Sequence, residues 1–348
     1  MGGKVAVTGA AGFIGGTIVG KLLDRGANVL SIDKVFMGNA ERKIARLDQI
    51  YRNRGREPKL EVLDLVYETH RLETLLIKNE IDTVYHLAAL FGGREFVDTR
   101  QVECSKMLAV DHNVIDAACN AGVERYFYAS SACVYSQSIQ DYGSKPTTEN
   151  QVLSTGEGLK SADNLYGFAK LMGEMQAIVY HQERGMKTSA ARFLTVYGPG
   201  EGDSSHAIAA LIERALNHED PFVIWGSGKQ ERGFTYVDDI AEGSIRACEA
   251  INDGTPVNLG TDERYSMDDT VELIFENVGW RPQVISHDLS KPEGPHSRAL
   301  DIRRAKELMG WEPKVGLDEG LRKTIAWHEK QRSLYAPLVG RGRHGEKE

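Results

Sequence analysis

The chain has 348 residues, a formal net charge of −8 and a pI of about 5.8. This length suits a large α/β unit with a smaller lobe, and the acidic balance argues against nucleic acid or an anionic membrane as the main partner. The longest apolar run, residues 84–91, is far too short to span a bilayer. The four cysteines show no CxxC spacing, which excludes the usual zinc and disulfide patterns and indicates no metal site and a reducing, cytoplasmic location.

The first element is a glycine-rich turn between an apolar strand and an amphipathic helix. The strand covers residues 5–8, three glycines follow at a GxxGxxG spacing, and the helix ends near Gly26. Gly9 permits a tight turn, Gly12 lets backbone approach a pyrophosphate, and Gly15 lets the helix pack closely on the strand. The helix N-terminus offers free N–H groups to the anion. The pattern therefore predicts a dinucleotide site, with a purely structural turn as the alternative.

The second strand supports this prediction. It covers residues 28–32 and ends in Asp33, about 20 residues after the glycines, where a carboxylate would bond the ribose of adenosine. Asp33 also favours NAD over NADP, because it would repel the extra phosphate.

Strands and helices then alternate along the chain. Further strands are expected over residues 60–64, 82–89, 125–131 and 188–194, and helical segments over 40–56 (then loop), 67–78, 105–121 and 164–184. This alternation predicts an α/β fold with a Rossmann-type, doubly wound parallel sheet, in which ligands bind beyond the strand ends. Asp33, Asp64, residues 86–89 and Ser131 should therefore line one crevice. The long, turn-rich stretch over residues 136–165 is expected to be a lid or binding loop.

Elements become shorter beyond residue 198, which indicates a smaller C-terminal α/β substrate lobe. Expected here are helices over 206–217, 267–278, 303–309 and 317–331 and a strand over 222–225. We assign residues 1–197 to the dinucleotide-binding domain, with 237–262 returning to it. Residues 198–236 and 263–335 are assigned to the substrate lobe, and 336–348 to a flexible tail.

A tyrosine and a lysine on one helix face suggest redox chemistry. Tyr166 and Lys170 lie four residues apart and share a face of the expected helix. A phenol titrates near pH 10 in isolation, and a neighbouring ammonium together with a positive nicotinamide would favour the phenolate. Ser131 could hydrogen-bond the same substrate hydroxyl. The alternative is that Tyr166 packs and Lys170 is a solvated charge, but the glycine turn and the strand-end serine favour the catalytic interpretation.

These motifs together resemble the nucleotide-sugar epimerase and dehydratase branch of the extended short-chain dehydrogenase/reductase family. The resemblance covers about residues 4–330 and rests on residues 8–15, Asp33, Asp64-Leu65, residues 86–89, 130–135, 166–170, 192–193, 197–199, 232–238, 298–301 and 310–313. Two positions depart from the family pattern, because Met107 and Thr195 stand where asparagine is usual.

The resemblance implies tightly held NAD, a nucleotide-diphosphate sugar as substrate, oxidation at sugar carbon 4, and a homodimer formed through two helices of the cofactor domain. It makes Tyr166 the base and Ser131 its partner, and Lys170 would bind the nicotinamide ribose and tune Tyr166. The implied cofactor contacts are Gly9, Gly12, Phe13, Ile14, Gly15, Asp33, Asp64, Leu65, Leu87, Ala88, Ala89, Tyr166 and Lys170. The implied substrate contacts are Ser131, Thr195, Trp225, Arg232 and Arg298. The two arginines would hold the diphosphate unless they form structural salt bridges.

The residues after Ser131 discriminate among reactions. The branch's dehydratases carry Asp-Glu there and its decarboxylases carry Glu, whereas this chain has Ala132-Cys133. This resembles the GDP-mannose 3,5-epimerase pattern, in which the cysteine is one acid/base and a lysine is the other. His206 aligns with that lysine. A thiolate and an imidazole both titrate near neutrality, so each could move protons on the carbons beside a 4-keto group.

Several alternatives remain open. Cys133 could be a buried filler, and His206 could be a surface or substrate-binding residue. The protein would then be a nucleotide-sugar 4-epimerase of the UDP-glucose or UDP-glucuronate type, or a net 4-dehydrogenase. A non-enzymatic dinucleotide sensor is disfavoured, because the chain retains Ser131, Tyr166 and Lys170 together.

Overall fold

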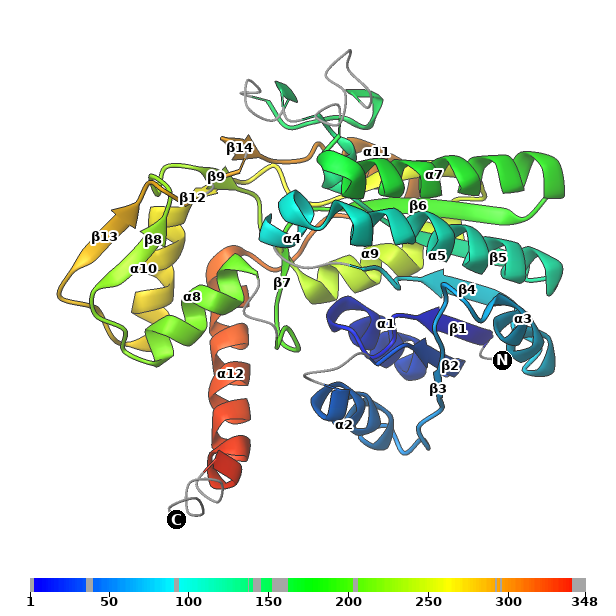
Figure 1. Ribbon diagram of the computed structural model, residues 1–348, viewed down its shortest axis with the longest axis horizontal. Helices are drawn as coiled ribbons and strands as arrows, with labels where there is room; N and C mark the ends of the chain where they lie inside the picture. Colours follow the sequence, from blue (N-terminus) through cyan, green and yellow to red (C-terminus); the bar gives the residue numbers. More distant parts are fainter. Residues whose placement is uncertain are drawn as a thin grey trace.

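The structure is a computed structural model that describes residues 3–35, 40–90, 94–136, 138–139, 145–151, 162–202, 206–291, 293–294 and 296–339. It consists of a large sheet with helices on both faces and a second lobe beside it (Figure 1). Among the described residues, no helix combines the length and the apolar character needed to cross a bilayer.

The large sheet has seven strands, and every neighbouring pair is parallel. Their spatial order is β3 (Leu60–Val62), β2 (Asn28–Asp33), β1 (Lys4–Thr8), β4 (Thr83–His86), β5 (Arg125–Ser131), β6 (Lys187–Phe193) and β11 (Asp253–Leu259). Thr8 is in register with both Ile32 and His86, so the carboxyl ends of the central strands meet at one edge. The predicted doubly wound parallel sheet is therefore confirmed.

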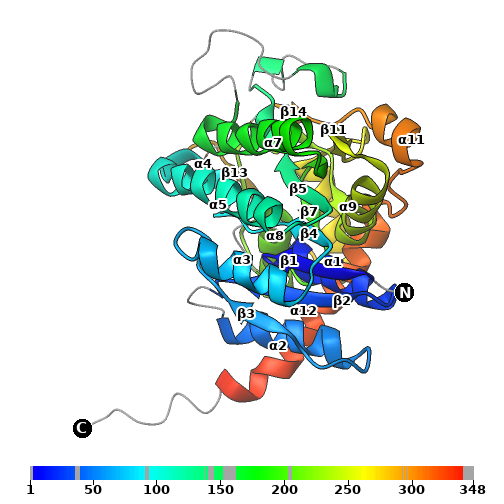
Figure 2. The same ribbon diagram turned by 90° about the vertical axis from the view of Figure 1, so that its right-hand side faces the viewer.

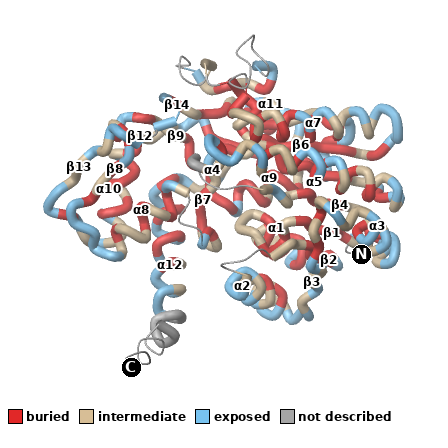
Figure 3. The backbone as a smooth tube through the Cα atoms, in the orientation of Figure 1, coloured by how far each residue is buried: buried red, intermediate tan, exposed pale blue. Residues whose placement is uncertain are grey.

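Two layers of helices bury the sheet. Side chains of α1 (Phe13–Asp24), α2 (Ala40–Arg52), α9 (Val237–Ala250) and α11 (Arg303–Met309) belong to one apolar cluster. Those of α3 (Thr69–Lys78), α5 (Gln101–Asn120) and α7 (Asn164–Arg184) cover the other face. Figure 2 shows the two layers on opposite sides of the strands, and Figure 3 shows that buried residues run through the sheet between them.

The second lobe is built from short elements around its own core. Its strands are β8 (Phe222–Trp225) paired with β13 (Ile285–Asp288), and β12 (Tyr265–Ser266), β9 (Glu231–Arg232) and β14 (Ser297–Arg298) in one small sheet. Its helices are α8 (Ala207–Leu216), α10 (Met267–Val278) and α12 (Leu317–Val339). The short parallel pair β7 (Val196–Tyr197) and β10 (Thr235–Tyr236) follows β6 and precedes α9. Residues 237–262, expected to return to the sheet, contain α9 and β11.

Short elements near the strand ends support the site. They are α4 (Arg94–Thr99) and the single-turn helices η1 (Ala132–Val134) and η2 (Glu149–Gln151). The expected loop over residues 136–165 lies largely outside the described residues, so its role stays a prediction.

Several element boundaries differ from the sequence prediction, including the start of α5, which lies at Gln101 and not at residue 105. The strand expected over 82–89 ends at His86. The Leu87 nitrogen is shared between the Thr8 carbonyl and hydroxyl oxygens, and the Ala88 nitrogen donates to the Thr8 hydroxyl and not to a backbone carbonyl. Helix α12 was expected to end at 331 and the tail to begin at 336, but the helix continues to Val339. Residues 340–348 lie outside the described chain.

Candidate active site

The glycine turn forms a cradle in which side chains do not fit. Gly9 has a φ of 70°, and a Cβ there would lie 2.8 Å from the Ala88 nitrogen. A Cβ at Gly15 would overlap the Gly9 carbonyl oxygen. Gly12 is the N-cap of α1 and carries no side chain, so it leaves the first N–H groups of the helix, at Phe13 and Ile14, open to an anion.

Two carboxylates lie at the strand ends beside this cradle. Asp33 accepts hydrogen bonds from the backbone nitrogens of Ala11 (3.0 Å) and Val35 (2.8 Å), so it is fixed against the glycine turn. Lys34 forms an ion pair with Asp64, at the end of the neighbouring strand. The positive charge of Lys34, the residue next to Asp33, is therefore directed toward the carboxylate of Asp64.

The apolar residues predicted to line the cofactor lie at the same edge. Leu65 is buried, and its carbonyl accepts a hydrogen bond from Asn113. Leu87 and Ala88 are held by Thr8, and Ala89 follows them directly. These two segments follow β3 and β4, which lie in the same parallel sheet as β1, so they leave the sheet at the same edge as the glycine turn.

Arg46 is a site residue that the sequence analysis missed. From α2 it donates to the carbonyl oxygens of Gly12 and Phe13, both at 3.0 Å, and burial lowers its pKa to about 10. A Cβ at Gly200 would overlap its guanidinium, so the loop after β7 also contacts it. No motif distinguishes Arg46 from the other arginines of residues 40–56.

Ser131 and Tyr166 meet where β5 ends and α7 begins. Ser131 hydrogen-bonds the Tyr166 phenol and accepts a 3.2 Å hydrogen bond from the Cys133 nitrogen. Burial raises the pKa of the Tyr166 phenol well above its ordinary value; the nearby Cys133 and Asp111 add to this effect, and Ser131 opposes it. The protein alone therefore does not produce the lowered phenol pKa expected from the sequence.

Lys170 lies one turn along α7 from Tyr166 and is buried against β5. Its ammonium donates to the Ala129 carbonyl oxygen at 2.8 Å and lies 4.8 Å from the centre of the Tyr128 ring. Burial lowers the pKa of Lys170, and Asp111 counteracts this most strongly. Lys170 is thus a buried cation and not a solvated helix charge.

Cys133 is part of the cluster that contains Tyr166. The cluster also includes Met107 and Ala169. The Cys133 carbonyl oxygen accepts a 2.7 Å hydrogen bond from the Asp163 nitrogen, and a Cβ at Gly167 would overlap that oxygen. This close approach of α7 to η1 fixes the position of the thiol-bearing turn relative to Tyr166.

His206 occupies the N-cap position of α8, without a capping hydrogen bond from its side chain, and has a partner that the sequence analysis did not identify. Its Nδ1 lies 2.6 Å from Oε1 of Glu201, and the Glu201 side chain is only 2% exposed, against 33% for His206. A buried carboxylate therefore lies against a partly exposed imidazole.

The two predicted diphosphate ligands are cross-strand neighbours. Arg232 on β9 is in register with Arg298 on β14. Arg232 donates to the carbonyl oxygens of Glu231 (2.7 Å) and Glu293 (2.6 Å). Arg298 donates to the buried carboxylate of Asp163 at 2.5 Å, and this links the second lobe to the start of α7.

The other predicted substrate residues lie further along the second lobe and its connection. Trp225 is half exposed at the end of β8, and the Lys291 ammonium lies 5.2 Å from the centre of its ring. Thr195 is exposed, with a φ of 25°, between β6 and β7.

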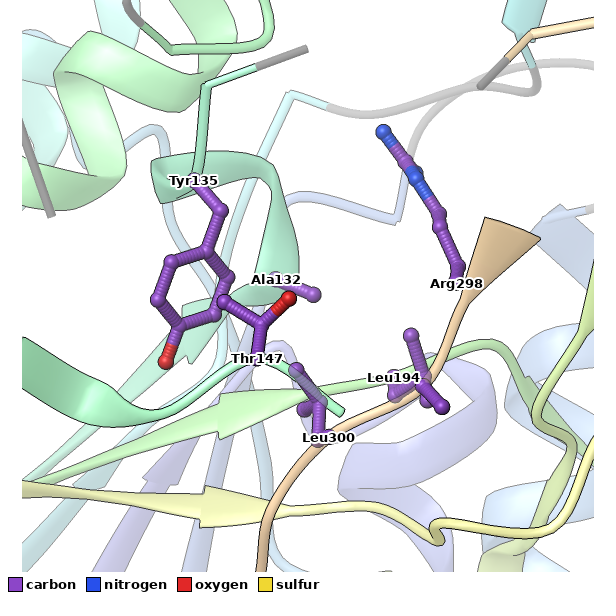
Figure 4. Close-up of a pocket in the computed structure, with 7 residues that line it drawn as sticks. Ala132, Tyr135, Thr147, Leu194, Arg298 and Leu300 are labelled. Carbon is purple, nitrogen blue, oxygen red and sulfur yellow. The ribbon is translucent and has the colours of Figure 1, made fainter. Parts of the chain in front are cut away.

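A narrow pocket lies between the η1 turn and β14 (Figure 4). It is lined by Ala132, Tyr135, Thr147, Leu194, Arg298, Ala299 and Leu300. In Figure 4 the Arg298 side chain extends away from Leu194 and Leu300. Of the predicted site residues the pocket includes Arg298, and Ala132 connects it to the Ser131–Cys133 turn.

The sheet order and the glycine turn define a Rossmann-type dinucleotide-binding fold, and Ser131, Tyr166 and Lys170 lie together where β5 ends and α7 begins. The family model described as "NAD dependent epimerase/dehydratase family" matches residues 5–260. The chain therefore belongs to this family, whose relatives act on nucleotide sugars, and NAD is its cofactor.

Individual relatives span nearly the whole chain. GDP-mannose 3,5-epimerase 1 of Oryza sativa subsp. indica is 31% identical over 341 residues, which cover 94% of this chain and 82% of the relative. The structure of UDP-glucose 4-epimerase of Thermotoga maritima with UDP-glucose is 25% identical, with a TM-score of 0.81, and covers 94% of this chain and 99% of that chain. The structure of UDP-glucuronic acid 4-epimerase of Bacillus cereus with UDP-glucuronic acid and NAD is 28% identical, with a TM-score of 0.79 and the same coverage.

The residues present fit NAD. A Cβ at Gly9, Gly12 or Gly15 would lie within 3.0 Å of backbone atoms of the turn or of Ala88, so these glycines permit a tight turn that leaves the N-terminus of α1 open. Asp33 provides a carboxylate at the end of the next strand, as ribose recognition requires. When bound, NAD would supply a hydride acceptor, and Tyr166 and Lys170 are the residues expected to hold its nicotinamide end.

Proposed function

We propose that the protein is a nucleotide-sugar epimerase that works through a transient 4-keto sugar and inverts carbon 3, carbon 5 or both. The observation that supports it best is the cluster in which Cys133 packs against Tyr166 while Ser131 bonds that phenol. A thiol at this position can exchange protons with carbons next to the carbon that Tyr166 helps to oxidise. The similarity to a GDP-mannose 3,5-epimerase agrees with this choice.

In the proposed mechanism the chain's own residues move protons. Tyr166, as phenolate, removes the proton from the hydroxyl on carbon 4, and Ser131 orients that hydroxyl. The hydride on carbon 4 would pass to the acceptor that bound NAD supplies, and the resulting ketone acidifies the C–H bonds on both neighbouring carbons. The Cys133 thiolate and His206, oriented by Glu201, remove a proton from one face and return one to the other. Tyr166 then returns its proton as the ketone is reduced, so there is no net redox change.

Solvent deuterium tests this function. Purified protein is incubated in deuterated buffer with GDP-mannose, and in parallel with UDP-glucose and UDP-glucuronate, and the recovered sugars are analysed by NMR. We expect deuterium at carbon 3 or carbon 5. A product inverted at carbon 4 without deuterium would contradict the proposal, and stoichiometric reduced NAD would identify a net dehydrogenase.

A nucleotide-sugar 4-epimerase is the second candidate. It is favoured by the structural similarity to two 4-epimerases that bind UDP sugars. In this case Cys133 would be a packing residue, and only the proton on the carbon 4 hydroxyl would be exchanged.

The Cys133→Ala variant separates the two candidates. We expect it to abolish deuterium exchange at carbons 3 and 5 while the transient oxidation at carbon 4 persists, because Ser131, Tyr166 and Lys170 are unchanged. NMR of the recovered sugar measures exchange, and nicotinamide absorbance measures oxidation. Cys119→Ala, in a partly buried thiol on α5, is the matched control. Undiminished exchange in Cys133→Ala would remove the thiol from the mechanism.

We also propose that α5 and α7 form a homodimer interface. The two helices pack side by side (Figure 1), and they carry five exposed large apolar side chains. These are Val102, Leu108, Met172, Met175 and Val179. Adjacent helices with apolar outer faces would bury them against the same helices of a second copy.

Met175→Glu is expected to shift the protein from dimer to monomer, because it places a charge in the centre of this apolar face. Light scattering coupled to size exclusion measures the mass. Ile77→Glu replaces an exposed apolar residue on α3 and should leave the mass unchanged. A wild-type protein that is monomeric at high concentration would refute the interface.

A further inference from the structure

A buried carboxylate beneath the site has no role in the mechanism described so far. Asp111 on α5 is 1% exposed. Its Oδ2 accepts a 2.7 Å hydrogen bond from the Tyr128 hydroxyl, and its Oδ1 lies 3.0 Å from Nε2 of His86. A charge that is removed from water in this way is costly unless a cation compensates it.

The imidazole does not supply that cation. The Thr8 hydroxyl oxygen accepts from the Leu87 and Ala88 nitrogens, so its own proton is directed to Nδ1 of His86 at 2.6 Å. His86 must then donate from Nε2 to Asp111 as a neutral ring. Burial also lowers the pKa of His86, in agreement with the neutral form.

Lys170 is the cation that faces this carboxylate. Its ammonium lies over the ring of Tyr128, whose hydroxyl donates to Asp111. Glu174, the other carboxylate near Lys170, is already paired with Arg192 at 2.6 Å and 2.8 Å. Asp111 therefore remains as the carboxylate near Lys170 that has no guanidinium partner among the described residues.

We infer that Asp111 is a positioning residue for the reaction, whose buried charge holds the Lys170 ammonium in place, through Tyr128, beneath Tyr166. This inference relies on the proposed function for the roles of Tyr166 and Lys170. Asp111 lies one helical turn after Met107, which occupies the position where the family usually has asparagine. Asp111 therefore supplies a polar side chain from α5, one helical turn after the position that Met107 occupies.

The charge of Asp111 influences both groups that titrate in the reaction. The groups that face Lys170 are Asp111, Cys133 and Glu174. Tyr166 is faced by Cys133, Asp111, Ser131 and Cys104. In both cases the negative charge of Asp111 raises the pKa, so its removal lowers the pKa of the phenol and that of the ammonium.

The Asp111→Asn variant tests this in a pH profile of turnover. The acid limb reports the Tyr166 phenolate and the alkaline limb reports the Lys170 ammonium, so both limbs should move to lower pH. Turnover at alkaline pH should fall several-fold relative to that at neutral pH. Asp116→Asn is the matched control, because Asp116 lies on the same helix and also accepts from a tyrosine, Tyr180, at 2.9 Å. Limbs that stay in place in Asp111→Asn would overturn the inference, even if turnover falls.

A thermal double-mutant cycle tests the same pair without activity. Asp111→Asn and Lys170→Met each leave one buried charge uncompensated, so the double variant should unfold at a higher temperature than additive effects of the two single changes predict. If Asp111→Asn does not fold, the double variant is still expected to fold. Additive losses, or a double variant that also fails to fold, would overturn the inference. The cycle also separates it from the proposed function, because a protein that turns over no nucleotide sugar can still show the coupling.

Discussion

Replacement of Tyr166 by phenylalanine should lower turnover by about 10²–10⁴-fold, the usual contribution of a positioned acid/base group. The phenol is 5% exposed and bonded to Ser131, so the loss of its hydroxyl removes the group that takes the proton from the substrate hydroxyl. NAD should stay bound, because the glycine turn and Asp33 are unchanged. Turnover is measured by product analysis, and NAD content by absorbance after denaturation.

Tyr180→Phe provides the matched control for this prediction. Tyr180 lies on the same helix and donates to Asp116, far along the sequence from the site residues of that helix. It should keep wild-type turnover. Full activity in Tyr166→Phe would refute the redox mechanism, whereas loss of NAD from that variant would indicate a role for the phenol in cofactor binding.

Gly15→Ala should abolish or severely weaken NAD binding. The added Cβ would overlap the Gly9 carbonyl oxygen, and neither atom can move without displacing the turn from the strand. Overpacking of this kind costs about 1–3 kcal/mol, and the displaced backbone no longer cradles a pyrophosphate. The measurement is NAD affinity by titration calorimetry, together with the unfolding temperature.

Gly20→Ala is the control for this second prediction, because it introduces the same change further along α1, away from the glycine turn. A Cβ there would lie 3.2 Å from the Arg54 guanidinium, the flexible end of a side chain that can move. Alanine is also the better helix former, so the variant should keep NAD binding. Wild-type affinity in Gly15→Ala would show that the turn does not determine cofactor binding.

The direction of the pKa shift at Tyr166 explains why an oxidised cofactor would make this phenol a better base. Burial raises the pKa of the Tyr166 phenol, and in this chain Asp111 raises it further. The phenolate therefore depends on Ser131, on positive charge at the site and on a substrate hydroxyl that approaches it. A positively charged nicotinamide beside Tyr166 would favour the phenolate, so the base should be most active when the cofactor is oxidised.

Sequence alone determined the features that depend on local pattern. The bounds of α7, α10 and α11 match the expected ranges, because apolar periodicity and capping are local properties. The glycine spacing predicted the cradle in the same way, since backbone conformation at Gly9 and close approach at Gly15 depend on the absence of a Cβ. The alternation of strands and helices was sufficient to predict the doubly wound sheet.

Tertiary structure alone decided which partner each charged side chain has. Lys34 pairs with Asp64, Arg298 with Asp163, His206 with Glu201, and Arg46 with the first turn of α1. Their charges are visible in the sequence, but a charge has no period or spacing that identifies its partner. The order of the strands and the packing of the second lobe bring these segments together, and burial then makes the pairing of each group energetically important. Asp111 is a further example. In the sequence nothing distinguishes it from other helix residues, because its partner cannot be identified there, whereas in the folded protein we infer that it is the buried counter-charge of Lys170.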